Sequence, residues 1–234
     1  MPTATVRKLA LDGADTPETS RARTILKHAH ESVQGFVDSF TDVRAHRGAG
    51  AGATTDEEQD LLRAALVFAA AGLDSVLKQL IRDAVPRLAQ LDPSVEEGLE
   101  TFVKRQLRGE LDTGEAVSGQ KFLARILIAA SHRDELIEQY VLSLTGTSLQ
   151  SADEVIRAAT ALGLASQELG IEKNQLRPIF GIRNEIIHEL DINLSAPNRN
   201  RESRARAQMV RHSNVMLEIG ERFVKSVEEK LTNA

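Results

Sequence analysis

The sequence predicts an all-α protein, and three observations carry that prediction. Ala, Leu, Arg and Glu are abundant among the 234 residues, and all four are good helix formers. Apolar residues recur at steps of three and four, whereas no convincing run of alternating β-branched residues is present. Thr55 and Ser151 are each followed three residues later by Glu, a capping-box pattern that predicts the start of a helix at both places.

The first part of the chain divides into three short segments. Residues 1–19 are expected to be disordered, and a helix is predicted over about 20–43. Segment 47–55 is rich in Gly and Ala and is typical of a linker. We therefore expect 20–46 to be an N-terminal helical arm, separate from a main helical domain at 56–234.

A long core helix is predicted to follow Thr55. Pro86 or Pro93 should end or kink it, because proline lacks the amide hydrogen that a helix interior needs. Segment 69–72 carries only small side chains, so a second helix is expected to approach closely there. Further helices are predicted over about 94–108, 119–144 with an interruption near Ser131, 151–167, 173–191 with its start or a kink at Pro178, and 201–231.

Composition excludes several classes of function. The absence of cysteine excludes disulfides, thiolate nucleophiles and cysteine-ligated zinc, and suits a reducing cytoplasm. The net charge of −5 and the shortage of aromatic residues argue against a long groove that reads single strands. No signal segment is apparent, and the longest apolar window, 64–73, is too short for a bilayer. We expect a soluble cytoplasmic protein without membrane contact, cofactor or metal.

The most informative segment is a polar stripe on the helix predicted over 173–191. Asn184, His188 and Asp191 follow one another at steps of four and three, and the long side chain of Arg183 can reach the same side. The other side of the helix is apolar, with Ile179, Ile182, Ile186 and Leu190. Other Arg–His pairs of similar spacing occur along the chain, so the helical context, and not the spacing, distinguishes Arg183 and His188.

These residues resemble the signature of a known family. Segment 183–188 reads Arg-Asn-Glu-Ile-Ile-His, and HEPN domains carry an arginine, a polar residue beside it and a histidine four to six residues after the arginine. Helix 61–80 resembles the leading core helix of that family, and the resemblance covers roughly 56–232. Leu190 stands where one HEPN subgroup carries a tyrosine that its antitoxin modifies, so that route of regulation is not expected.

The resemblance implies a HEPN-like antiparallel helical bundle, here with an extra N-terminal helix. It also implies a homodimer with a composite active site and metal-independent cleavage of RNA. Toxin or defence systems are the expected setting, with an antitoxin or defence protein as a partner. In such a reaction the arginine fork of Arg183 would clamp phosphate and His188 would transfer protons. Asn184 would orient the reacting groups or contact the substrate, and these three are the candidate catalytic residues.

Two further sets of residues are candidates for substrate contact. Asp74 lies within the apolar core helix, where it could orient Arg183 or His188, although an ordinary surface role is the alternative. Four arginines near the C-terminus could hold RNA phosphates. Alternatively, they could form a solvated helix start or pair with the acidic segment 56–58. They are Arg199, Arg201, Arg204 and Arg206.

Three alternatives compete with a ribonuclease. The chain could be a catalytically inactive HEPN-like module that binds RNA, a nucleotide or a partner protein. It could be a helical structural protein unrelated to the family. Arg183 and His188 could also be ordinary solvated residues of an amphipathic helix.

Overall fold

A computed structural model describes residues 4–12, 15–48, 52–108, 119–193, 195, 197 and 200–233. Within these ranges the chain forms eight α-helices and no strand, apart from an isolated bridge between Ile192 and Arg201, so the all-α prediction is confirmed. The helices are α1 (Ser20–His46), α2 (Asp56–Leu91), α3 (Pro93–Arg108), α4 (Gly119–Ile128), α5 (His132–Thr145), α6 (Ala152–Ala161), α7 (Lys173–Glu189) and α8 (Arg206–Asn233).

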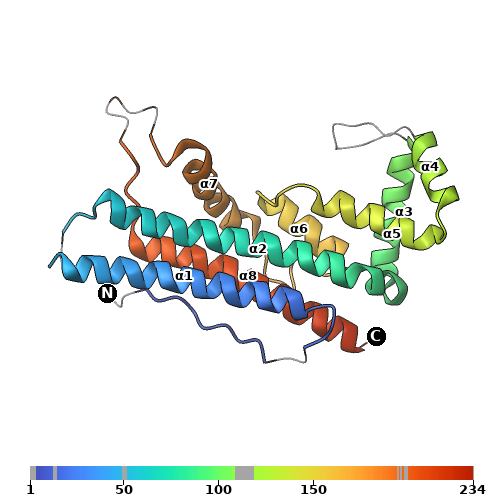
Figure 1. Cartoon of the computed structure of the whole chain (residues 1–234), viewed down its shortest axis with the longest axis horizontal. Coiled ribbons are helices and arrows are strands. Elements are labelled where there is room, and N and C mark those ends of the chain that lie inside the picture. Colours follow the sequence, from blue (N-terminus) through green and yellow to red (C-terminus); the bar gives the residue numbers. More distant parts are fainter. Residues whose placement is uncertain are drawn as a thin grey trace.

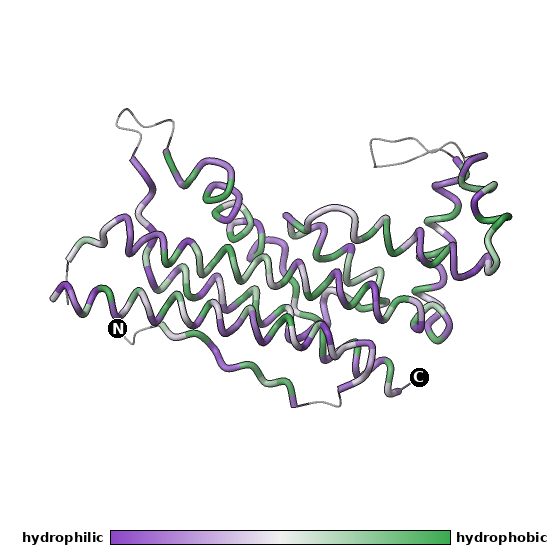
Figure 2. The backbone as a smooth tube through the Cα atoms, in the orientation of Figure 1, coloured by the Kyte–Doolittle hydropathy of each residue, from purple (hydrophilic) through white to green (hydrophobic). Residues whose placement is uncertain are grey.

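Three long helices, α1, α2 and α8, lie side by side and form the centre of the molecule (Figure 1). Hydrophobic and hydrophilic positions alternate along each of them (Figure 2), as expected for helices that bury one face. Helices α1 and α2 approach closely at Gly72, where an added Cβ would lie 2.4 Å from the Cβ of Ala29. The small residues of 69–72 therefore permit the close helix approach that the sequence predicts.

Helix α1 belongs to this core and is not a separate arm. Its inward residues are almost fully buried against α2 and α8. They are Ala22, Leu26, Val33, Val37 and Phe40. The Gly- and Ala-rich composition of 47–55 suggested that the helix before it is separate from the main domain. The apolar stripe of α1 needs a partner surface, however, and α2 and α8 supply it.

The described part of 1–19 also packs against the bundle, in contrast to the disorder we expected. Val6 is buried, and the Arg7 amide donates to Asn214 Oδ1 over 2.9 Å. Glu221, buried on α8, accepts from Arg7 Nη1 at 2.9 Å and from the Ala10 amide at 3.1 Å. These contacts come from residues more than 200 positions away, which local composition does not reveal.

Several predicted helix boundaries are confirmed. Thr55 and Glu58 form a complete capping box at the start of α2, and the Ser151 side chain accepts from the Glu154 amide at the start of α6. The Ser131 side chain caps α5, so the helix predicted over 119–144 is interrupted there. Helix α2 runs through Pro86 and ends at Leu91, just before Pro93 opens α3, a position where proline is favourable.

Other boundaries differ from prediction, among them the start of α8, which lies at Arg206 rather than near 201. Helix α6 ends at Ala161 rather than near 167, because Gly163 takes a positive φ of 65° and reverses the chain. Pro178 lies inside α7, which already begins at Lys173, so it does not mark the start.

Helix α2 is long and apolar enough to cross a membrane by length and composition alone. This finding corrects the expectation that the apolar segments of the chain are too short to cross a bilayer. In the fold, however, more than half of that window is buried among other helices, and the core helix of a soluble protein passes the same test. This finding is weak evidence in either direction.

Candidate functional site on α7

Helix α7 presents the candidate residues because its other face is used for packing. Leu176, Ile179, Phe180, Ile182 and Ile186 are buried, and α7 contacts α2 and α6. On the remaining surface Arg183 and Asn184 are half-buried, while His188 is exposed. The amphipathic pattern thus places the motif at the edge of the bundle, where a large ligand can reach it.

Arg183 and Asn184 are directly linked. Arg183 Nη1 donates a hydrogen bond to Asn184 Oδ1 over 2.9 Å. Within the described chain no carboxylate forms an ion pair with Arg183, so its positive charge is oriented by a neutral amide and is not neutralised. His188 bonds to neither residue in the described part of the chain, although it lies on the same rigid helix.

The end of α7 departs from the predicted pattern. Leu190 and Asp191 have φ values of 52° and 60°, in the left-handed region, so helical periodicity stops at Glu189. Leu190, expected on the apolar face, is 63% exposed, and Ile187 is 39% exposed. Asp191, expected on the polar stripe, turns inward instead and its side chain is fully buried.

Asp191 is the centre of a buried ion-pair cluster that the sequence does not reveal. Its carboxylate accepts from Arg63 Nε at 2.8 Å and from Arg204 Nη2 at 2.5 Å. Burial alone would raise the pKa of Asp191, but the hydrogen bonds from Arg204 and Arg63 outweigh it and hold the pKa below its usual value. Arg63 also donates to the Glu202 carbonyl at 2.7 Å. The cluster fastens the end of α7 and the segment before α8 to α2.

The arginines predicted to hold RNA phosphates are largely occupied by partners within the chain. Arg201 donates to both carboxylate oxygens of Asp60, at 3.0 and 2.5 Å. Arg204 binds Asp191 and also Glu185, the latter at 2.6 Å. Both arginines therefore pair with carboxylates within the chain, but with Asp60, Asp191 and Glu185 rather than with the acidic segment 56–58 that the sequence suggested.

Arg206 and Arg199 complete that set of four. Arg206 Nη1 donates to the Ala4 carbonyl at 2.7 Å, and its guanidinium lies 5.9 Å from the centre of the Phe40 ring. Arg206 therefore fastens the N-terminal segment to the bundle. Arg199 lies outside the described residues.

Asp74 does not orient the motif, which corrects the expectation from sequence. Its Oδ1 accepts from the Leu149 amide at 2.9 Å, and its Oδ2 accepts from Lys78 Nζ at 3.0 Å. Asp74 thus ties the segment before α6 to α2, and its bonds do not extend to Arg183 or His188.

A cavity of about 340 Å³ lies beside the C-terminal half of α7, and its lining is mainly acidic. Among the described residues that line it, Glu185, Glu189, Asp191 and Glu202 contribute carboxylates and Arg204 is the one cation. Carboxylates repel phosphate, so the described part of this lining does not favour RNA. Among the described residues, no group of three or more His, Asp or Glu side chains could hold a metal ion.

Comparisons of the chain with protein-family models, with curated proteins and with solved structures find no match. The described chain is an all-α protein whose penultimate helix carries half-buried Arg183 and Asn184 and exposed His188 on one side. The family resemblance consequently depends on the residues of segment 183–188 and on their place in the helical order.

Proposed function

We propose that this chain is a metal-independent endoribonuclease of HEPN type, acting as a toxin or defence effector. One observation carries the proposal. Arg183 is a half-buried cation on a rigid helix, oriented by the Asn184 amide without a carboxylate partner in the described chain, and exposed His188 follows on the same helix. A guanidinium in this state keeps its charge and most of its donors for a phosphate.

The chemistry assigned to these residues needs no metal. A base removes the proton from the ribose 2′-hydroxyl, whose oxygen attacks the adjacent phosphorus. The bond from phosphorus to the 5′-oxygen breaks, and an acid protonates that oxygen. The products are a 2′,3′-cyclic phosphate and a 5′-hydroxyl. Histidine can serve as either proton-transfer group near neutral pH, and Arg183 would stabilise the charge on the pentacovalent phosphorus.

One motif histidine per chain does not supply both an acid and a base, so the proposal includes a homodimer. A two-fold axis beside α7 would bring two copies of His188 to one phosphate. The exposed apolar side chains of Ile187 and Leu190 lie next to the motif in sequence and would be covered by such an interface. RNA is then the substrate, and an antitoxin or defence protein is the expected regulatory partner in the cytoplasm.

A second candidate is a catalytically inactive HEPN-like module that binds RNA, a nucleotide or a partner protein. The observation that favours it is the pairing of Arg201 and Arg204 with carboxylates, which leaves less positive potential near α7 than a polyanion substrate would use. This candidate predicts binding without cleavage.

The test is cleavage of total cellular RNA in EDTA by the purified full chain. Wild type should produce fragments with 5′-hydroxyl and cyclic phosphate ends, and His188→Ala and Arg183→Ala should each lower the rate by 100-fold or more, on the order expected for preorganised charge and proton transfer. His28→Ala is the matched control, because His28 is an exposed histidine on α1. Equal cleavage by wild type and His188→Ala, or products with 5′-phosphate ends, would refute the proposal.

A further inference from the structure

A second cavity, of about 680 Å³, lies at the other end of the fold among α3, α5 and α6. Its volume falls in the range typical of small-molecule sites, roughly 300–1,000 Å³. No residue of α7 lines it, so it is separate from the Arg-Asn…His helix. Gly98 helps to form it, since an added Cβ there would lie 2.8 Å from the Tyr140 hydroxyl.

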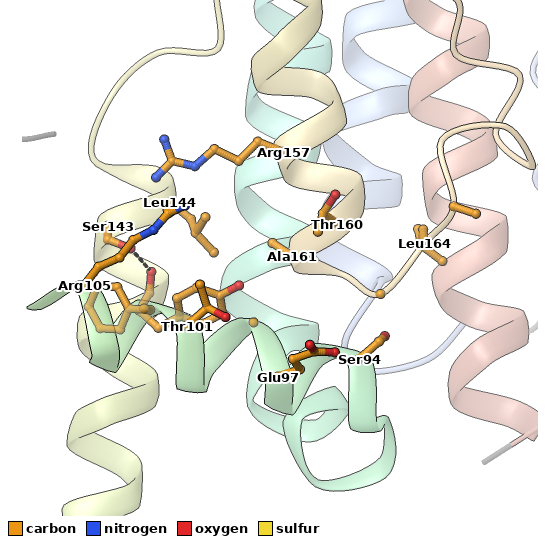
Figure 3. Close-up of a pocket in the computed structure, with 15 residues that line it drawn as sticks. Ser94, Glu97, Thr101, Arg105, Ser143, Leu144, Arg157, Thr160, Ala161 and Leu164 are labelled. Atoms are coloured by element: carbon orange, nitrogen blue, oxygen red, sulfur yellow. Dashed lines mark hydrogen bonds between the residues drawn. The ribbon is translucent and has the colours of Figure 1, made fainter. Parts of the chain in front are cut away.

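Two arginines at the mouth of this cavity lack a partner among the described residues. Arg105 comes from α3 and Arg157 from α6, and Figure 3 shows their side chains extending toward the same opening. Other arginines of the same region are paired: Arg125 binds Glu135 at 2.7 Å, and Arg133 binds Glu96 at 3.3 Å. Two uncompensated guanidinium groups converging on one opening form a place for an anion.

One part of the cavity wall is apolar and aromatic. The rings of Phe102 and Tyr140 pack with centroids 5.4 Å apart, and Leu144 lies beside them in the lining. Burial raises the pKa of Tyr140, an effect that the nearby charge of Arg157 only partly offsets, so its hydroxyl stays protonated at neutral pH. This wall suits a hydrocarbon or a flat ring rather than a hydrated ion.

Charge is distributed unevenly along the cavity. Glu97 and Ser94 lie at the end opposite Arg157 (Figure 3), and the cationic groups among the described lining residues are the two arginines. An anionic ligand would therefore enter with its charged group toward Arg105 and Arg157 and away from the Glu97 carboxylate.

We propose that this cavity binds a small amphipathic organic anion. Its phosphate monoester or carboxylate group is held between Arg105 and Arg157, and its apolar body lies against Phe102, Tyr140 and Leu144. The inference is independent of RNA cleavage, because it concerns other helices and predicts binding rather than catalysis.

The protein carries its own reporter for the test. Tyr140 is the one tyrosine of the chain and there is no tryptophan, so tyrosine emission reports directly on this cavity. The probes are hexyl phosphate and heptanoate, which do not absorb near 280 nm. Inorganic phosphate is the control for the anionic group alone, and hexanol is the control for the apolar body alone. Titrations followed by tyrosine emission and by calorimetry should saturate with at least one of the two amphipathic anions, and the stronger binder identifies the headgroup.

Substitutions distinguish this site from general charge attraction. Arg105→Gln and Arg157→Gln should each weaken binding of the better probe about tenfold, the effect of losing one charge-assisted contact. Arg108→Gln is the control, because Arg108 is an exposed arginine of the same helix α3 that does not line the cavity. The proposal is overturned if neither amphipathic anion saturates, if the two cavity variants bind like Arg108→Gln, or if inorganic phosphate or hexanol binds as tightly.

Discussion

Replacing Asp191 by asparagine tests the buried cluster that holds the end of α7. The substitution keeps the shape of the side chain but removes the charge that Arg63 and Arg204 neutralise at 2.8 and 2.5 Å. The Arg63 side chain is 3% exposed, so its guanidinium would be left in a dry environment with less compensation. We expect the folded state to lose stability.

The size of the loss in stability depends on which partners Arg63 and Arg204 keep after the substitution. Removing one partner of a buried ion pair costs about 3–5 kcal/mol. Arg63 keeps contacts to Asp60 and to the Glu202 carbonyl, and Arg204 keeps Glu185. The loss should therefore lie at the lower end, about 3 kcal/mol. For a chain of this length that corresponds to a fall in Tm of about 6–12 °C.

The pH dependence has a defined sign. The pKa of folded Asp191 lies below its ordinary value, because the hydrogen bonds from Arg204 and Arg63 outweigh the opposing effect of burial. Its contribution to stability is therefore complete above the unfolded pKa, about 3.9, and is lost as the pH falls through the folded pKa. The difference between wild type and Asp191→Asn should be constant from about pH 5 to 7 and should shrink below about pH 4.

Urea unfolding followed by far-ultraviolet circular dichroism measures both quantities. Glu100→Gln is the control, because Glu100 forms an exposed pair with Lys104 and should change the free energy of unfolding by less than about 0.5 kcal/mol. The reasoning is refuted if Asp191→Asn unfolds like wild type, or if the difference between them grows as the pH falls.

Three further predictions concern stability and are measured by thermal unfolding. Gly72→Ala should lower the free energy of unfolding by about 1–3 kcal/mol, because the new Cβ would meet the Cβ of Ala29 at 2.4 Å. Gly35→Ala, where the new Cβ meets no atom within 4 Å, should instead stabilise α1 by up to about 1 kcal/mol. Equal effects of the two substitutions would contradict the close approach of α1 and α2. Thr55→Ala should cost about 1 kcal/mol, since it removes the cap of α2, and an unchanged Tm would mean that the cap contributes nothing. His188→Ala should change stability by less than about 0.5 kcal/mol, because the side chain is exposed, so a large loss would mean that any fall in activity reflects folding.

Local features were the most predictable from sequence. The capping box at Thr55 and the break at Ser131 depend on residues within one helical turn, and both are present in the structure. The apolar positions of α7 up to Ile186 were also assigned correctly, because a regular helix repeats every 3.6 residues. The assignment failed at Leu190 and Asp191, where two left-handed residues end that regularity.

Contacts between distant segments were not predictable in this way. The roles of Asp74, Arg201 and Arg204 depend on partners many residues away, such as Leu149 and Asp60. A charged residue has the same local pattern whether it meets solvent, RNA or a carboxylate from another helix. The choice among these is made only when the helices pack.

The sequence by itself determined that the chain is helical, where several helices begin and end, and which residues share the exposed side of α7. These properties arise from hydrogen bonding and side-chain periodicity within a few residues. Only the tertiary structure decided that α1 joins the core, that Asp191 is buried between Arg63 and Arg204, and that Arg105 and Arg157 face one cavity. Those outcomes depend on which helix surfaces meet, because burial and charge pairing arise between segments that only the fold brings together.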